Sequence, residues 1–182
     1  MCNGYTQREV CLMNQLRKLW EQHVYWTRFF IISTAADLAD LEPVTKRLLR
    51  NPGDFAAVLT QFYGVRLSNR FKDLFTQHLL IAADLVNAAK KQEAAKAEEA
   101  RQKWYANAGD IAKFLADINP CWSETRWKAM LYDHLAMTER EAVLRLGGKY
   151  AEDIQIFDRI EEEALKMADD MANGIIKQFC LC

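Results

Sequence analysis

The chain has 182 residues, of which 51% are apolar and 27% are charged, and its formal net charge at pH 7 is −1. This balance is typical of a folded globular domain and excludes an intrinsically disordered chain. No segment approaches the roughly 20 uninterrupted apolar residues of a membrane-spanning helix. A net charge near zero gives no overall attraction to nucleic acid or to a membrane surface. We therefore predict a single domain over residues 1–182, with neither nucleic acid nor a membrane as its partner.

The N-terminal residues lack the basic and then apolar pattern of a secretory signal, which favours a cytoplasmic location. The five cysteines follow no regular framework, as expected for free thiols in a reducing compartment. Cys180 and Cys182 close the sequence, and their redox state stays open.

Seven glycines and three prolines are few helix breakers for this length, so the composition favours an all-α fold. Residues 7–40 predict one long helix, because its inward positions from Met13 to Thr34 recur at steps of three and four. Two short helices follow at about 43–50 and 54–62, separated by an Asn-Pro-Gly turn.

A long helix at about 66–90 completes the first half as long, short, short, long, and the second half repeats this order. The spacing of Thr138 and Glu141 is that of a capping box, which predicts a helix start at that point. The predicted elements are two long helices, two short helices and a last long helix, over about 66–90, 94–118, 124–136, 138–146 and 149–178.

Together these elements predict an up-and-down-like bundle of four long helices with two short-helix crossovers. The halves, about 7–91 and 94–178, can be superposed at an offset of about 86 residues. At that offset Phe71 falls on Phe157 and Asn87 falls on Asn173. We therefore predict an internal duplication of a helical pair.

Three inward-facing histidines form the first candidate site. His23 and His78 lie on the apolar faces of different long helices, and His134 lies similarly on a short one. Neutral imidazole is a good ligand for transition metals, and Glu161 on the last helix is the best-placed carboxylate for a fourth position. Haem between His23 and His78 is a further alternative. However, the Glu-x-x-His pairs of dinuclear bundles are missing, so histidines buried for structural reasons are the competing interpretation.

Arg28 forms the second candidate site, because it follows an inward position amid aromatic residues. It could reach solvent, pair with an acid of the last helix, or bind an anionic ligand. We find no glycine-rich phosphate loop, no Gly-x-Ser-x-Gly elbow and no other catalytic signature, so no catalytic residue is assigned.

Charge is distributed unevenly along the chain. Residues 1–91 carry twelve basic and eight acidic side chains, whereas the remainder carries twelve and seventeen. This asymmetry indicates complementarity within the chain or between two copies of a homodimer. The sequence identifies no other protein partner.

Four phrases, at residues 19–28, 44–52, 116–122 and 167–179, resemble a family of small uncharacterised proteins of Gram-positive bacteria. The resemblance covers nearly the whole chain after residue 15. Members of that family are often labelled acetylglutamate kinase. The label implies an amino-acid kinase fold with a parallel sheet and glycine-rich loops, and this sequence predicts neither, so no kinase residue is carried over.

Three functions follow as hypotheses. The first is a non-catalytic bundle with a structural or protein-interaction role, since no catalytic motif is present. The second is a metal- or haem-binding bundle centred on His23, His78 and Glu161, with His134 as a further ligand. The third is an enzyme that acts on a small anionic substrate held by Arg28.

Overall fold

A computed structural model describes residues 4–181 of the chain. This part contains no strand and is built from helices joined by short turns. The all-α prediction is confirmed. In chain order the described helices are α1 (Gln7–Ala35), α2 (Leu41–Leu48), α3 (Asn51–Lys90), α4 (Ala94–Ile118), α5 (Glu124–Leu146) and α6 (Tyr150–Phe179).

The start of α1 is set by a capping box. Thr6 Oγ1 accepts from Glu9 N, and Glu9 Oε2 accepts from Thr6 N at 2.6 Å. These bonds satisfy backbone donors that a helix start leaves unpaired. The helix ends at Ala35, five residues before the predicted end at residue 40, because the chain turns through a left-handed Asp37 with φ of 51°.

The predicted break between the helices at 54–62 and 66–90 lies inside α3. The backbone hydrogen bonds run from Asn51 to Lys90, but Gly64 has φ of 73° and ψ of 169°, which are not helical angles. A residue without Cβ adopts this conformation at little cost. The predicted short helix at 54–62 and the predicted long helix at 66–90 are therefore the two arms of one kinked helix.

The two short helices predicted at 124–136 and 138–146 are wrong, because α5 is one continuous helix. Its start is as predicted, since Ser123 Oγ accepts from Arg126 N at 3.3 Å. Thr138 and Glu141, which suggested a second helix start, make other contacts. Thr138 Oγ1 donates to the carbonyl of His134 one turn back, and Glu141 binds an arginine of another helix.

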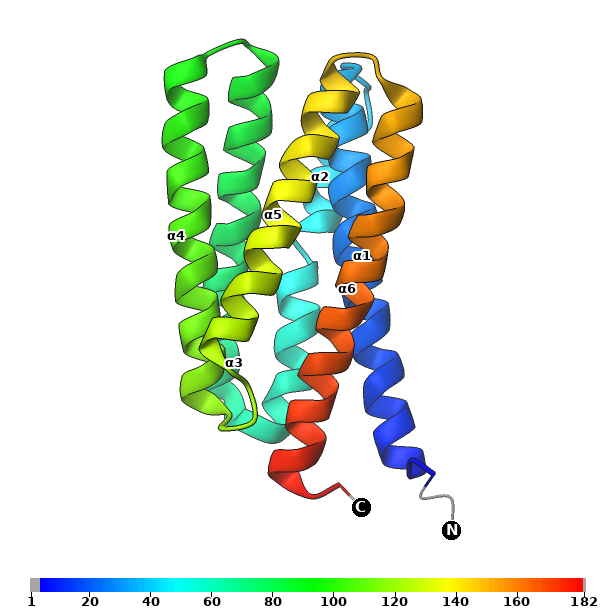
Figure 1. The fold of residues 1–182 in the computed structure, drawn as a ribbon, viewed down its shortest axis with the longest axis vertical. Helices are drawn as coiled ribbons and strands as arrows, with labels where there is room; N and C mark the ends of the chain where they lie inside the picture. The colour runs from blue at the N-terminus through cyan, green and yellow to red at the C-terminus, as the bar shows by residue number, and fades with distance from the viewer. Residues whose placement is uncertain (1–3, 182) are drawn as a thin grey trace.

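The described chain therefore has five long helices and the eight-residue α2, instead of four long helices with two short-helix crossovers. In Figure 1 the hairpin of α3 and α4 forms one side, the pair of α1 and α6 forms the other, and α5 crosses between them. The upper half of α5 leans away from the hairpin tip. The duplication of residues 7–91 in 94–178 stays a prediction.

One large buried cluster draws side chains from every long helix, and includes Trp20, Phe75, Trp104, Trp127 and Met171. A smaller cluster of Phe30, Ile31, Val44, Leu48, Leu79, Val86 and Ala142 lies where α2 packs against α1 and α3. Ion pairs tie α1 to α6 at the surface of this core, for example Arg17 to Asp169 at 2.6 Å. No helix within residues 4–181 combines the length and apolar character that spanning a bilayer requires.

Candidate functional site

The three histidines do converge in the core. The ring centroid of His23 on α1 lies 5.6 Å from that of His134 on α5 and 6.4 Å from that of His78 on α3. All three side chains are buried, with exposed fractions of 3% or less. Burial lowers the pKa of His78 to about 4 and that of His134 to about 3, and it lowers the pKa of His23 well below 6.5. The cluster is therefore neutral at pH 7.

His78 has no nitrogen free for a ligand. Asn107 Nδ2 donates to the carbonyl of Leu74, so Asn107 Oδ1 accepts from His78 Nδ1 at 2.9 Å. Trp104 Nε1 can only donate, and it donates to His78 Nε2 at 3.1 Å. Together these bonds assign the Nδ1-protonated tautomer and satisfy both nitrogens. His78 therefore joins α3 to α4 as a structural residue.

His23 and His134 differ from His78 in this respect. Their Nδ1 atoms have no hydrogen-bond partner among the described residues. Nearby, Trp20 Nε1 and Trp127 Nε1 are also without partners there, and the two indole rings stack at 6.4 Å. An indole N–H cannot act as a ligand to a metal cation, because it can only donate a hydrogen bond.

Glu161 does not reach the histidines. It accepts a hydrogen bond from Tyr25 Oη at 2.5 Å on the exposed side of α1 and α6, and this bond raises the pKa of Tyr25 to about 12. Within residues 4–181, no three His, Cys, Asp or Glu side chains are arranged to hold a metal ion. Of the cysteines, Cys11, Cys121 and Cys180 are exposed free thiols, whereas Cys2 and Cys182 lie outside the described residues.

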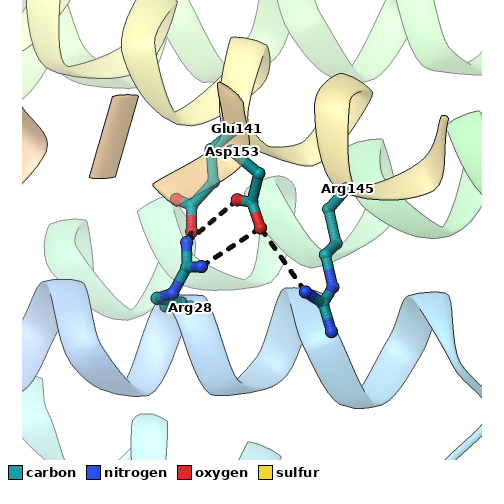
Figure 2. Close-up of polar contacts among 4 residues, drawn as sticks. All are labelled: Arg28, Glu141, Arg145 and Asp153. Carbon is teal, nitrogen blue, oxygen red and sulfur yellow. Dashed lines mark hydrogen bonds and ion pairs between the residues drawn. The ribbon is translucent and has the colours of Figure 1, made fainter. Parts of the chain in front are cut away.

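Arg28 is held in a network of buried carboxylates that joins α1, α5 and α6 (Figure 2). Its Nη1 lies 2.7 Å from Glu141 Oε1 and 2.9 Å from Asp153 Oδ1, and its Nη2 lies 3.1 Å from Asp153 Oδ2. Arg145 Nη1 reaches Asp153 Oδ2 at 3.5 Å. The predicted pairing with an acid of the last helix is therefore seen. Both terminal nitrogens of Arg28 are occupied, so an anionic ligand would have to displace a carboxylate.

The two carboxylates are almost fully enclosed, since the side chains of Glu141 and Asp153 are 2% and 0% exposed. Burial raises the pKa of Glu141 to about 7, although Arg28 opposes this shift. Two arginines face two acids, so the network is neutral when all four groups are charged. Such a network fixes how the three helices meet, and breaking one partner leaves a buried charge unpaired.

An apolar cavity of about 220 Å³ is lined by residues of α1, α2, α3, α4 and α5. Five alanines contribute to its wall, and their small side chains leave the space that larger residues would fill: Ala82, Ala83, Ala89, Ala97 and Ala142. Phe30 and Trp104 supply large apolar surfaces. Its polar side chains are Thr27, Thr138 and Glu139.

The cavity and the network of Arg28 lie on different sides of α5. Thr138, Glu139 and Ala142 line the cavity, whereas Glu141 points to α1 and α6. Glu139 is bound to Arg101 of α4 at 3.1 Å. Sequence reasoning missed the cavity, Glu141 and Asp153. The frequent alanines of residues 82–100 are compatible with missing side-chain volume, but they are equally compatible with close helix packing.

No family model, curated protein or solved structure matches the chain. The resemblance to small proteins of Gram-positive bacteria therefore stays a prediction. The described residues contain no strand, and so they provide no part of the sheet that the kinase label implies.

Proposed function

We propose that this chain is a non-catalytic binding protein whose apolar cavity takes a small, uncharged organic molecule. The cavity of about 220 Å³ is the observation that supports this most directly. An engineered apolar cavity of about 150 Å³ is enough to bind benzene. By proportion, this cavity suits a molecule of roughly nine non-hydrogen atoms.

The exposure of the cavity's apolar wall also favours a binding role. Val143, which lines the cavity, is 53% exposed, whereas Phe30 and Trp104 in the same wall are 5% and 3% exposed. A bound apolar ligand would remove such surface from water, which stabilises the complex roughly in proportion to the apolar area buried.

The chemistry of the wall supports binding without catalysis. Glu139 is the only charged residue among the described side chains that line the cavity, and its carboxylate is paired with Arg101. A general acid or base needs a titratable group within reach of the substrate. No pair of such groups lines this wall.

Thermal unfolding with a panel of small aromatic probes tests the proposal. A ligand at 100 times its Kd stabilises the folded state by about 2.7 kcal/mol, which raises the Tm by roughly 5 to 10 °C for a chain of this size. Ala142→Leu adds three carbon atoms to the wall, occupies about a third of the roughly nine-atom space and should reduce the shift. Ala136→Leu, on the exposed side of α5, should leave the shift intact. Equal shifts in the wild type and Ala142→Leu, or none in either, would exclude this site.

A metal-binding bundle is the second candidate, because the Nδ1 atoms of His23 and His134 are buried without partners in the described chain. Neutral imidazole is the form that binds a metal. Haem between His23 and His78 is disfavoured, since both nitrogens of His78 are engaged. Elemental analysis of protein purified without chelators tests for a bound metal, and the His23→Ala, His134→Ala double variant is the control. A near-stoichiometric metal that the variant loses would favour this function.

A cytoplasmic location and a homodimer remain part of the proposal. Pairing within the chain already uses part of the charge asymmetry, for example Arg17 with Asp169. Light scattering at high protein concentration tests the homodimer, and a monomer there would exclude it.

A further inference from the structure

Three aromatic side chains, Tyr25, Trp26 and Phe29, form a stripe across the outer face of α1. The ring centroids of Trp26 and Phe29 lie 5.2 Å apart, and Tyr25 lies one helical turn before Phe29. Tyr25 and Phe29 are 38% and 42% exposed, and Ile154 of the neighbouring α6 is 54% exposed. Single exposed apolar residues are ordinary, whereas a contiguous group of them indicates an interaction surface.

One side of the aromatic stripe is acidic, because it meets α6. The ring of Tyr25 packs on Phe157 at 5.4 Å between centroids, and its hydroxyl donates to Glu161 Oε1 at 2.5 Å. This hydrogen bond is the main cause of the raised pKa of Tyr25, and the charges of Glu21 and Asp158 raise that pKa further. Three carboxylates therefore lie around the Tyr25 hydroxyl.

The other side of the aromatic stripe is basic, because it meets α2. The guanidinium carbon of Arg47 lies 4.8 Å from the centroid of the Trp26 ring. Lys46 is exposed beside it, and Glu42 is the only acid in α2. Within residues 4–181, Lys46 takes part in no ion pair. The exposed surface of α2 therefore carries positive charge that the chain leaves uncompensated.

The acidic and basic sides lie at the same level of α1, because Tyr25 binds Glu161 and the next residue, Trp26, packs against Arg47. A two-fold axis parallel to α1 would keep this level and place α2 of each copy opposite α6 of the other copy. An axis that crosses α1 within the interface would place α2 opposite α2. Opposite charges meet only in the first arrangement, and charge complementarity of this kind selects one docking geometry over others.

We propose that the aromatic stripe is the surface through which two copies of this chain form a two-fold dimer, with each α2 against α6 of the other copy. This inference rests on the homodimer of the proposed function and names its surface. Phe29 lies in the middle of the stripe, where an aromatic side chain contributes most to association. None of Tyr25, Trp26 and Phe29 lines the apolar cavity, so dimer formation leaves the cavity wall unchanged.

Light scattering on a dilution series of the full chain tests the surface. Phe29→Ser removes the central aromatic ring and should raise the dimer Kd roughly 30-fold or more. The control is Leu80→Ser, which removes a side chain that is 47% exposed on α3, away from the stripe. It should leave the dimer Kd unchanged. Circular dichroism verifies that each variant is folded.

A charge exchange tests which helices meet. Lys46→Glu and Asp158→Lys each reverse one exposed charge, and each variant alone brings like charges together at both contacts of a symmetric dimer. We expect each to raise the dimer Kd roughly tenfold at low ionic strength. When the two variants are mixed in equal amounts, both contacts of the heterodimer again pair opposite charges. We expect the mixture to associate as tightly as the wild type.

The outcomes separate this inference from the homodimer itself. If the wild type stays monomeric at high concentration, the homodimer fails, and the inference fails with it. If the wild type dimerises and Phe29→Ser dimerises equally well, the homodimer stands but the aromatic stripe is not its surface. If mixing Lys46→Glu with Asp158→Lys restores no association, the pairing of α2 with α6 is overturned.

Discussion

Acid should destabilise this protein through its buried histidines, and His134 offers the clearest test. The side chain is 3% exposed, and burial lowers its pKa to about 3. In the unfolded chain its pKa returns to about 6.5. As the pH falls below about 6.5, the unfolded chain therefore binds a proton that the folded chain does not, and stability falls until the pH reaches the folded pKa.

The magnitude follows from the two pKa values. Each pH unit between them is worth about 1.4 kcal/mol, so from pH 7 to pH 5 His134 alone lowers the free energy of unfolding by about 2 kcal/mol. His134→Leu removes this loss while roughly keeping the side-chain volume. Glu141 has a raised pKa and so acts in the opposite direction, but it is present in both proteins and cancels in the comparison.

Urea denaturation at pH 7 and pH 5 measures the effect. We expect the wild type to lose about 2 kcal/mol more than His134→Leu between the two pH values. Leu135→Met, a neighbouring core substitution that does not titrate, should lose as much as the wild type. An equal loss in the wild type and His134→Leu would mean that His134 ionises as easily in the folded protein as in the unfolded chain. The burial of His134 of α5 against His23 of α1 would then be refuted.

Three further predictions concern stability. Arg28→Met leaves two buried carboxylates without their main partner, so we expect it to lower the free energy of unfolding by about 3 to 5 kcal/mol in urea denaturation. The control Arg126→Met breaks an exposed pair and should lower it by less than about 1 kcal/mol. Equal losses in the two variants would contradict the burial of the network. Burial raises the pKa of Glu141 to about 7, so the folded chain binds this proton more tightly than the unfolded chain does. The resulting contribution to the free energy of unfolding is full below about pH 4.5 and is lost as the pH rises through 7. Glu141→Gln should therefore gain about 2 kcal/mol relative to the wild type between pH 5.5 and pH 8, and a pH-independent difference would argue against the shift. A Cβ on Gly174 would lie 1.8 Å from Trp122 Nε1, so Gly174→Ala should lower the Tm and reduce the free energy of unfolding by about 3 kcal/mol or more. The added Cβ of Gly109→Ala makes an ordinary contact, so this control should raise the free energy of unfolding by up to about 1 kcal/mol.

Local patterns predicted most of the fold. Helical periodicity located α1, α4, α6 and both arms of α3, and the predicted break between 62 and 66 is the kink at Gly64, where the missing side chain favours that backbone conformation. The errors came from side chains with two available partners. Thr138 and Glu141 have the spacing of a capping box, but Thr138 binds the carbonyl of His134 within α5 and Glu141 binds Arg28 of α1, so α5 is continuous.

The candidate sites were predictable only in part. An inward position on an amphipathic helix predicts that a histidine is buried, and all three are buried together. Which nitrogen is satisfied depends on neighbours such as Asn107, which come from another helix and cannot be read from spacing. Glu161 illustrates the same limit, because it lies one residue, or about 100° around α6, after the buried Ile160 and binds Tyr25 instead of facing the core.

The cavity could not have been predicted, because its volume depends on how α1, α3, α4 and α5 meet. Alanine at a helix position can allow close packing or leave a space, and the sequence is the same in both cases. Here α5 leans towards α1 and α6, where Arg28 holds Glu141 and Asp153, and the alanines of the hairpin then face a gap.

Methyl chemical shifts of the folded chain, recorded while 4-ethylphenol is added, test the central claim most directly. We predict saturable shifts at the methyl groups of Thr27, Ala82 and Ala142, with none at Ala136 on the exposed side of α5. Contacts between ligand protons and the Thr27 methyl should appear in the same sample. Shifts scattered over exposed methyl groups, or no saturable change at these three residues, would contradict a binding cavity in this protein.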